Sequence, residues 1–124
     1  MKKKLLVVDD EPALTRMVKL NLERTGRFEV HTENRGAAAL ETARALRPDL
    51  ILLDVMMPGM QGDEIAAAIE EDPMLQGTPY IFLTAIVTHS ETGITRGEIG
   101  GRLFLAKPVR LQEMLDMIDR VLGE

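Results

Sequence analysis

The sequence of 124 residues lacks cysteine, long apolar runs and an excess of basic side chains. Without cysteine the chain has no disulfide bond and no thiolate chemistry, a composition that suits a cytosolic protein. No stretch approaches the roughly 18 consecutive apolar residues that a membrane-spanning helix needs. The formal net charge of −5 argues against non-specific nucleic-acid binding, because phosphate contacts require clustered Lys and Arg. We therefore expect a cytoplasmic protein with no membrane segment and no direct nucleic-acid contacts.

The composition that remains is typical of one globular domain. Hydrophobic residues make up 45% of the chain and charged residues 28%, and the length is sufficient to bury a core. No linker, low-complexity tract or repeat divides the sequence. We expect a single domain over residues 1–124.

Four short apolar runs predict buried strands, and an alternating segment over 28–32 predicts a strand nearer an edge; segments with helical spacing of apolar residues separate them. The expected strands are 5–8, 28–32, 50–54, 79–83 and 102–106. The expected helices are 12–25, 36–46, a segment around 62–72, 88–97 and 110–122, and the apolar pattern is thin in 88–97. Regular alternation of strand and helix predicts an α/β fold, with a doubly wound parallel sheet and helices on both faces.

Four of the five expected strands end in side chains that can perform chemistry. Asp9 and Asp10 follow the first strand, Asp54 ends the third, Thr84 follows the fourth and Lys107 follows the fifth. In open parallel sheets, ligands bind beyond the carboxyl ends of the strands, where the strand order reverses. In the doubly wound order 2-1-3-4-5 this reversal lies between the first and third strands, which would bring Asp9, Asp10 and Asp54 together.

Three converging carboxylates favour a hard divalent cation, and Mg²⁺ is the natural candidate because it prefers oxygen ligands. A carboxylate can also attack phosphorus and form an aspartyl-phosphate. In such a site Lys107 supplies a positive charge, and Thr84 a hydroxyl donor, for phosphoryl oxygens.

Each of these residues also has an ordinary structural interpretation. Asp10 or Glu11 can cap the following helix, Thr84 can stabilise a turn, and Lys107 can be a surface lysine. Taken singly, these roles are the more common ones. Their joint occurrence at the ends of four strands favours a functional site.

The combined motif, which extends over Lys3–Leu122, resembles the receiver domain of two-component response regulators. The resemblance is carried by Asp9-Asp10, Asp54 with Met57-Pro58-Gly59 and Gly62, Thr84-Ala85, and Lys107-Pro108. It implies a flavodoxin-like fold with five parallel strands in the order 2-1-3-4-5 and five helices, and no output domain in this chain.

The resemblance also implies roles for individual residues. Asp54 is the expected phosphoacceptor, receiving a phosphoryl group from a phosphohistidine on a sensor histidine kinase or phosphotransfer protein. The expected Mg²⁺ ligands are Asp9, Asp10, Asp54 and the backbone carbonyl of Met56. Lys107 is expected to pair with Asp54 and then with the phosphoryl group, and the Lys107-Pro108 peptide corresponds to one that is cis in the family.

Switching in this family implies that Thr84 moves toward the phosphate while Phe104 turns inward behind it. The surface that would change comprises the helix 88–97, the strand 102–106 and the helix 110–122. Output would be contact with an unidentified downstream protein. A homodimer through the 88–122 face is compatible with the sequence, which does not require one.

Two features depart from the common receiver pattern. Met56 and Ile86 are apolar at positions that flank the path of a hydrolytic water, which predicts slow autodephosphorylation. The glycine-rich segment 97–101 replaces a short acidic turn and predicts a short or mobile fourth helix.

Other functional classes stay open. A small Mg²⁺-dependent phosphohydrolase would usually carry a second acid where this chain has Met56, so we expect no reaction beyond the protein's own phosphorylation and dephosphorylation. A phosphorylation-independent interaction module would not need the complete set of acids, hydroxyl and amine. Nucleotide binding is disfavoured because no glycine-rich loop follows the first strand.

Overall fold

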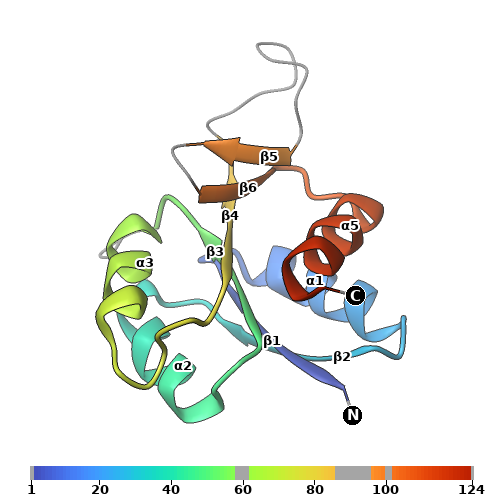
Figure 1. Cartoon of the computed structure of the whole chain (residues 1–124). Helices are drawn as coiled ribbons and strands as arrows, with labels where there is room; N and C mark the ends of the chain where they lie inside the picture. Colours follow the sequence, from blue (N-terminus) through green and yellow to red (C-terminus); the bar gives the residue numbers. More distant parts are fainter. Residues whose placement is uncertain (1, 58–61, 86–95, 100–101, 124) are drawn as a thin grey trace.

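The computed structural model describes residues 2–57, 62–85, 96–99 and 102–123, and its centre is a six-stranded sheet (Figure 1). The strand order is β2-β1-β3-β4-β6-β5. The strands are β1 (Lys3–Val8), β2 (Phe28–Glu33), β3 (Leu50–Asp54), β4 (Tyr80–Thr84), β5 (Arg96–Ile99) and β6 (Arg102–Ala106). All pairs are parallel except β5–β6. The five parallel strands therefore confirm the predicted 2-1-3-4-5 order, with β6 as the fifth strand.

The described helices lie where the apolar spacing predicted them. They are α1 (Pro12–Glu23), α2 (Ala39–Leu46), α3 (Gly62–Glu71) and α5 (Leu111–Leu122), and a short 3₁₀ turn, η1 (Gly36–Ala38), precedes α2. Proline at the first position of α1 costs no hydrogen bond there, because that N–H would have no helical partner. In the described part of the chain, none of these helices is long and apolar enough to cross a membrane.

The segment before β6 differs from the prediction. Residues 88–95 of the expected fourth helix lie outside the described residues. Arg96 and Gly97, its last two residues, belong to β5, so the helix prediction is wrong at these positions. β5 pairs antiparallel with β6, from Arg96 opposite Leu105 to Ile99 opposite Arg102. Residues 96–99 form a strand because the outer edge of β6 has backbone groups available for hydrogen bonds. A helix is not favoured there, because too few apolar residues are spaced to form a helical face that could be buried.

Two apolar layers enclose the sheet, and they explain the uninterrupted apolar runs of β1 and β3. Leu5 and Val7 pack with α1 and α5 on one face, whereas Leu6 and Val8 pack with α2 and α3 on the other. Figure 1 shows α1 and α5 on one side of the sheet and α2 and α3 on the opposite side. The sequence of a strand that is covered on both faces is typically a continuous run of apolar residues. The packing fixes the carboxyl ends of these strands.

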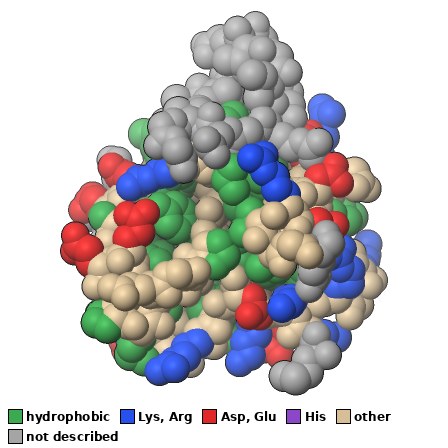
Figure 2. Space-filling model, in the orientation of Figure 1, with side chains coloured by type: hydrophobic (Ala, Val, Ile, Leu, Met, Phe, Trp, Pro, Cys, Tyr) green, Lys and Arg blue, Asp and Glu red, His purple; other side chains and the backbone are tan. Residues whose placement is uncertain are grey.

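Charged side chains of both signs occupy the surface around this core. Figure 2 shows Lys and Arg side chains lying among Asp and Glu side chains on the described part of one face. That part of the surface does not form one continuous basic field of the kind that phosphate-backbone binding uses.

Candidate functional site

The carboxylates at the ends of β1 and β3 lie side by side. Val8, the last residue of β1, is paired in register with Leu53 of β3, so Asp9 and Asp54 are neighbours at the same edge of the sheet. Both are buried, whereas Asp10 is exposed. One carboxylate oxygen from each of Asp9, Asp10 and Asp54 lies within 4.8 Å of the others. The structure thus brings together the three acids that the sequence analysis selected.

Lys107 reaches this group of acids from the end of β6. Its Nζ lies 2.8 Å from Asp9 Oδ2, 3.3 Å from Glu11 Oε1 and 3.4 Å from Asp54 Oδ1. The lysine is therefore nearer to Asp9 than to Asp54, the partner that the family resemblance implied. The Lys107-Pro108 peptide is cis, and the Lys107 N–H donates to Thr84 O over 2.9 Å.

Burial and neighbouring charges shift the pKa values of Asp9, Asp54 and Lys107. Burial and, to a smaller extent, the negative charge of Asp9 raise the pKa of Asp54 to about 6, against the opposing effect of Lys107. Burial also raises the pKa of Asp9, against hydrogen bonds from Lys107 and the Glu11 N–H. For Lys107 burial lowers the pKa, but Asp9, Asp54 and Glu11 outweigh it and raise the pKa overall. The acids therefore carry more negative charge in a small volume than one ammonium compensates.

Backbone geometry behind Asp54 depends on Gly62. The Gly62 N–H donates to Val55 O over 2.9 Å. A Cβ at Gly62 would lie 2.2 Å from Asp54 O, closer than any real contact. Glycine is needed here so that the start of α3 can approach the end of β3. The Asp54 side chain is also held by the backbone, because Asp54 Oδ1 accepts the Met56 N–H over 3.3 Å.

Beside Asp54 and Lys107 lies a cavity of about 350 Å³, which we call the acidic crevice. It is lined by Asp10, Glu11, Asp54, Met56, Thr84, Ala85 and Lys107. The carboxylate oxygens are hard ligands, and their excess of negative charge would be relieved by a divalent cation. The residues present therefore fit a metal such as Mg²⁺. They also fit a phosphoryl group, for which Lys107 and the Thr84 hydroxyl are suitable partners.

Comparison with known families identifies the family of the chain. Residues 5–119 match the model of the response regulator receiver domain. The chain belongs to this family. The receiver matches curated response regulators and solved receiver structures over nearly its whole length.

Among curated relatives, the receiver is 36% identical to the DNA-binding response regulator MtrA of Mycolicibacterium smegmatis, over 93% of this chain and 48% of that protein. It is 35% identical to the alkaline phosphatase synthesis transcriptional regulatory protein PhoP of Bacillus subtilis, over 98% of this chain and 49% of that protein. The chain thus spans about half the length of the curated relatives it matches.

Solved structures have the same fold. The chemotaxis protein CheY4 of Vibrio cholerae is 32% identical, with a TM-score of 0.82 and coverage of 98% of this chain and 100% of that one. The receiver domain of the sensor histidine kinase PA1611 of Pseudomonas aeruginosa is 25% identical, with a TM-score of 0.80 and full coverage of both chains. That structure has a magnesium ion coordinated in its active site cleft.

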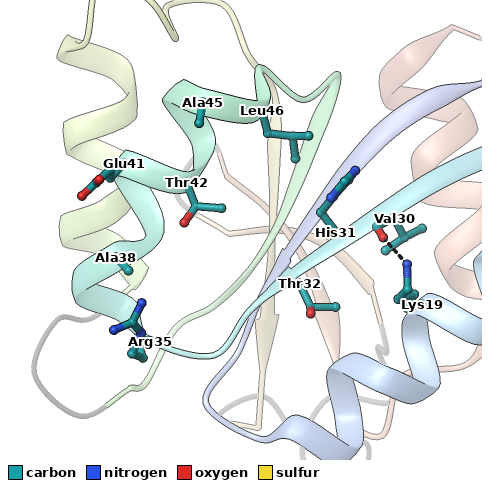
Figure 3. Close-up of a pocket in the computed structure, with 10 residues that line it drawn as sticks. All are labelled: Lys19, Val30, His31, Thr32, Arg35, Ala38, Glu41, Thr42, Ala45 and Leu46. Carbon is teal, nitrogen blue, oxygen red and sulfur yellow. Dashed lines mark hydrogen bonds between the residues drawn. The ribbon is translucent and has the colours of Figure 1, made fainter.

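The receiver also has a larger hollow of about 700 Å³ along the free side of β2, which we call the β2 groove. Figure 3 shows side chains from α1, β2 and α2 around it. Lys19 Nζ lies 2.6 Å from Val30 O and 3.0 Å from Glu23 Oε2, and the Glu23 carboxylate accepts the Val30 N–H. His31 pairs with Glu29. Because these charges have partners, the groove does not have the excess negative charge of the acidic crevice.

Sequence reasoning did not assign two residues to the crevice that the structure connects to it. The sequence indicates Glu11 only as a helix cap, whereas its Oε1 lies 3.3 Å from Lys107 Nζ. Its place directly after Asp9-Asp10 was the available signal. Asn34 follows β2 and donates to the backbone of Asp9, a contact across 25 residues that no local pattern indicates.

Proposed function

We propose that this receiver is a phosphoacceptor switch, in which Asp54 takes a phosphoryl group from a phosphohistidine on a sensor histidine kinase or phosphotransfer protein. The observation that carries the proposal is the position of Asp54, buried at the end of β3 with Asp9 beside it and Lys107 Nζ 3.4 Å away. Its family and the architecture of the crevice support the same role.

The proposed reaction uses the Asp54 carboxylate as nucleophile. With a pKa of about 6, Asp54 is ionised at neutral pH and more basic than an ordinary aspartate. Oδ1 already accepts the Met56 N–H and faces Lys107, so we assign the attack to Oδ2. The new O–P bond forms as the P–N bond of the phosphohistidine breaks, and the imidazole leaves with the bonding electron pair.

Around the transferring group, this chain supplies ligands, charge and a donor. Asp9, Asp10, Asp54 and the Met56 carbonyl would hold Mg²⁺, which shields the acids from the incoming phosphoryl group. Lys107 is already near Asp54, so a small shift away from Asp9 would bring its ammonium to the phosphoryl oxygens. Thr84, buried at the end of β4, would donate its hydroxyl to the same oxygens.

The signal would leave the crevice through β4 and β6. Phe82 is paired in register with Phe104, and Thr84 with Ala106, so movement at Thr84 acts directly beside the strand that carries Phe104. We propose that this movement remodels the 88–122 face for a downstream protein or a second copy of the chain. The relative MtrA of Mycolicibacterium smegmatis is a DNA-binding response regulator. We propose that this switch acts in the cytoplasm.

We retain slow autodephosphorylation as a hypothesis. Met56 is 60% exposed and lines the crevice, where its apolar side chain does not orient a hydrolytic water. Ile86, the second residue behind this hypothesis, lies outside the described residues. Met56 also stands where a phosphohydrolase would carry its second acid, which argues against that alternative. A phosphorylated lifetime of seconds in the purified protein would contradict slow hydrolysis.

The test is phosphorylation by acetyl phosphate, followed by intact-protein mass spectrometry. We expect a Mg²⁺-dependent phosphoryl adduct on the wild type and none on Asp54→Asn. Asp63→Asn, which changes an exposed acid in the first turn of α3, is the matched control and should be labelled like the wild type. If no adduct depends on both Asp54 and Mg²⁺, the phosphoacceptor proposal is wrong.

A further inference from the structure

We infer that Asn34 is a positioning residue for the acidic crevice, and that it sets the affinity of the receiver for divalent cations. The inference rests on the proposed function, because it concerns the same acids. Asn34 follows the last residue of β2 and does not line the crevice. Its effect would be transmitted through the segment 9–15, which carries Asp9 and Asp10 from the end of β1 into α1.

The Asn34 side chain joins the two ends of this segment. Its Nδ2 donates to Asp9 O over 2.8 Å and to Thr15 Oγ1 over 3.0 Å. Since a backbone carbonyl can only accept, the first bond fixes which end of the amide faces the segment. Thr15 is buried, and its hydroxyl donates to Pro12 O over 3.1 Å. One amide therefore connects the peptide that bears Asp9 to the first turn of α1.

Two other side chains contact the start of α1: the Asp9 carboxylate accepts the Glu11 N–H over 3.0 Å, and Lys107 Nζ lies 3.3 Å from Glu11 Oε1. The N-cap residue of α1, Glu11, makes no side-chain capping hydrogen bond, and Pro12 has no N–H to offer. The preceding peptide is held by the sheet, because the Asp9 N–H donates to Glu33 O over 3.1 Å. Asn34, the residue after Glu33, adds a second bond to the backbone of the same residue: Glu33 O accepts the N–H of Asp9, and the Asn34 side chain donates to its carbonyl.

Asp10 is the acid that depends most on this arrangement. Its side chain is exposed, so packing does not fix it, and the backbone of the segment sets the direction of its carboxylate. A divalent cation requires the oxygens of Asp9, Asp10 and Asp54 to converge, and they now lie within 4.8 Å of one another. Groups that orient metal ligands typically contribute 10- to 100-fold to metal affinity. Because Asn34 acts through the backbone, we expect its loss to weaken Mg²⁺ binding about tenfold.

The experiment measures Mg²⁺ affinity by calorimetry and by the Mg²⁺-dependent rise in thermal midpoint. We expect Asn34→Ala to raise the Mg²⁺ dissociation constant about tenfold and Thr15→Val to raise it severalfold. Thr15→Ser keeps the hydroxyl and should restore affinity close to that of the wild type. In acetyl phosphate labelling, Asn34→Ala should raise the half-saturating Mg²⁺ concentration more than it lowers the rate at saturating Mg²⁺.

Thr42→Val is the matched control for lost stability. The Thr42 hydroxyl donates to Glu33 Oε1 over 2.7 Å, beside Asn34 but outside the acid segment, so its removal should leave Mg²⁺ affinity unchanged. Unchanged affinity in a folded Asn34→Ala protein would overturn the inference alone. Absence of Mg²⁺ binding by the wild type would instead overturn the proposed metal site. If Asn34→Ala does not fold, the comparison of Thr15→Val with Thr15→Ser decides the inference.

Discussion

The acidic crevice and the β2 groove of the receiver differ more in charge than in size. The β2 groove has a volume of about 700 Å³, and the acidic crevice only about 350 Å³. In the groove, each of the cationic side chains Lys19 and Arg35 has a carboxylate partner, Glu23 and Glu33 respectively. At the crevice, among the described residues, the ammonium of Lys107 contacts three carboxylates, those of Asp9, Glu11 and Asp54, and Asp10 adds a fourth beside Asp9 and Asp54. Excess charge, and not volume, marks the functional site.

Burial explains why the same kinds of side chain behave differently in the two places. The Lys19 and Glu23 side chains are 41% and 35% exposed, so water screens their charges. They also hydrogen-bond the backbone of Val30 and so protect the open edge of the sheet. Asp9 and Asp54 are almost completely buried, and their repulsion is retained in the folded state. The groove contributes to stability, whereas the crevice reduces it in favour of function.

The largest expected effect comes from Gly62→Ala. The new Cβ would lie 2.2 Å from Asp54 O and 2.9 Å from Val55 Cα, and these backbone atoms cannot move without displacing the end of β3. We expect a loss of about 3 kcal/mol in the free energy of unfolding, with a weaker Mg²⁺ response. Urea unfolding at fixed pH measures the first quantity and calorimetry the second.

Gly77→Ala is the control for the backbone cost of replacing a glycine. Gly77 has a φ of +85°, and nothing lies within 4 Å of its Cβ position, so only conformational strain of about 1 kcal/mol is expected. If Gly62→Ala and Gly77→Ala lower the free energy of unfolding equally, close packing behind Asp54 is not the cause of the loss at Gly62.

The next effect has the opposite sign. Asp9→Asn removes a buried negative charge and its repulsion of Asp54, while Lys107 keeps Asp54 and Glu11 as partners. We expect the metal-free protein to become more stable by about 1–2 kcal/mol, and its Mg²⁺ affinity to fall strongly. Chemical denaturation without Mg²⁺ measures the gain. A substantial loss of stability would mean that the attraction between Asp9 and Lys107 outweighs the repulsion between Asp9 and Asp54. The crevice would then stabilise the fold, as the groove does.

The pH dependence of stability should separate the two regions as well. Because burial raises the pKa of Asp54 from 3.8 to about 6, the folded protein binds this proton more tightly than the unfolded chain. The resulting destabilisation is fully present above pH 6 and shrinks as the pH falls toward 3.8. Between pH 7 and pH 5, the metal-free wild type should gain about 1 kcal/mol relative to Asp54→Asn. Urea unfolding of both proteins at the two pH values measures this difference.

Glu23 in the groove should behave in the reverse manner. The Val30 N–H and Lys19 lower the pKa of Glu23 below its ordinary 4.5. Its contribution to stability is therefore present above pH 4.5 and is lost as the pH falls through the lowered pKa. Glu23→Gln should remove this acid-sensitive contribution without affecting the change near pH 6. If the difference in stability between the wild type and Asp54→Asn does not change between pH 7 and pH 5, the raised pKa of Asp54 is contradicted.

The sequence predicted the crevice more completely than its surroundings. The acids could be placed together because the carboxyl ends of parallel strands meet at one edge of a sheet. β5 could not be predicted, since pairing of Arg96–Ile99 with the edge of β6 is a tertiary interaction with little local signal. The contact of Asn34 with Asp9 depends on loop backbone geometry, which residue spacing does not encode.

The smallest expected effect is that of Lys19→Met in the β2 groove. The substitution removes the bond from Lys19 Nζ to Val30 O and the half-exposed pair with Glu23, but Glu23 can still accept the Val30 N–H. Because exposed ion pairs contribute little, we expect a loss of about 0.5 kcal/mol in the free energy of unfolding. Mg²⁺ affinity, measured by calorimetry, should equal that of the wild type. A change in Mg²⁺ affinity comparable to that expected for Asn34→Ala would show that groove and crevice are energetically coupled, and that the larger hollow contributes to the function of the smaller one.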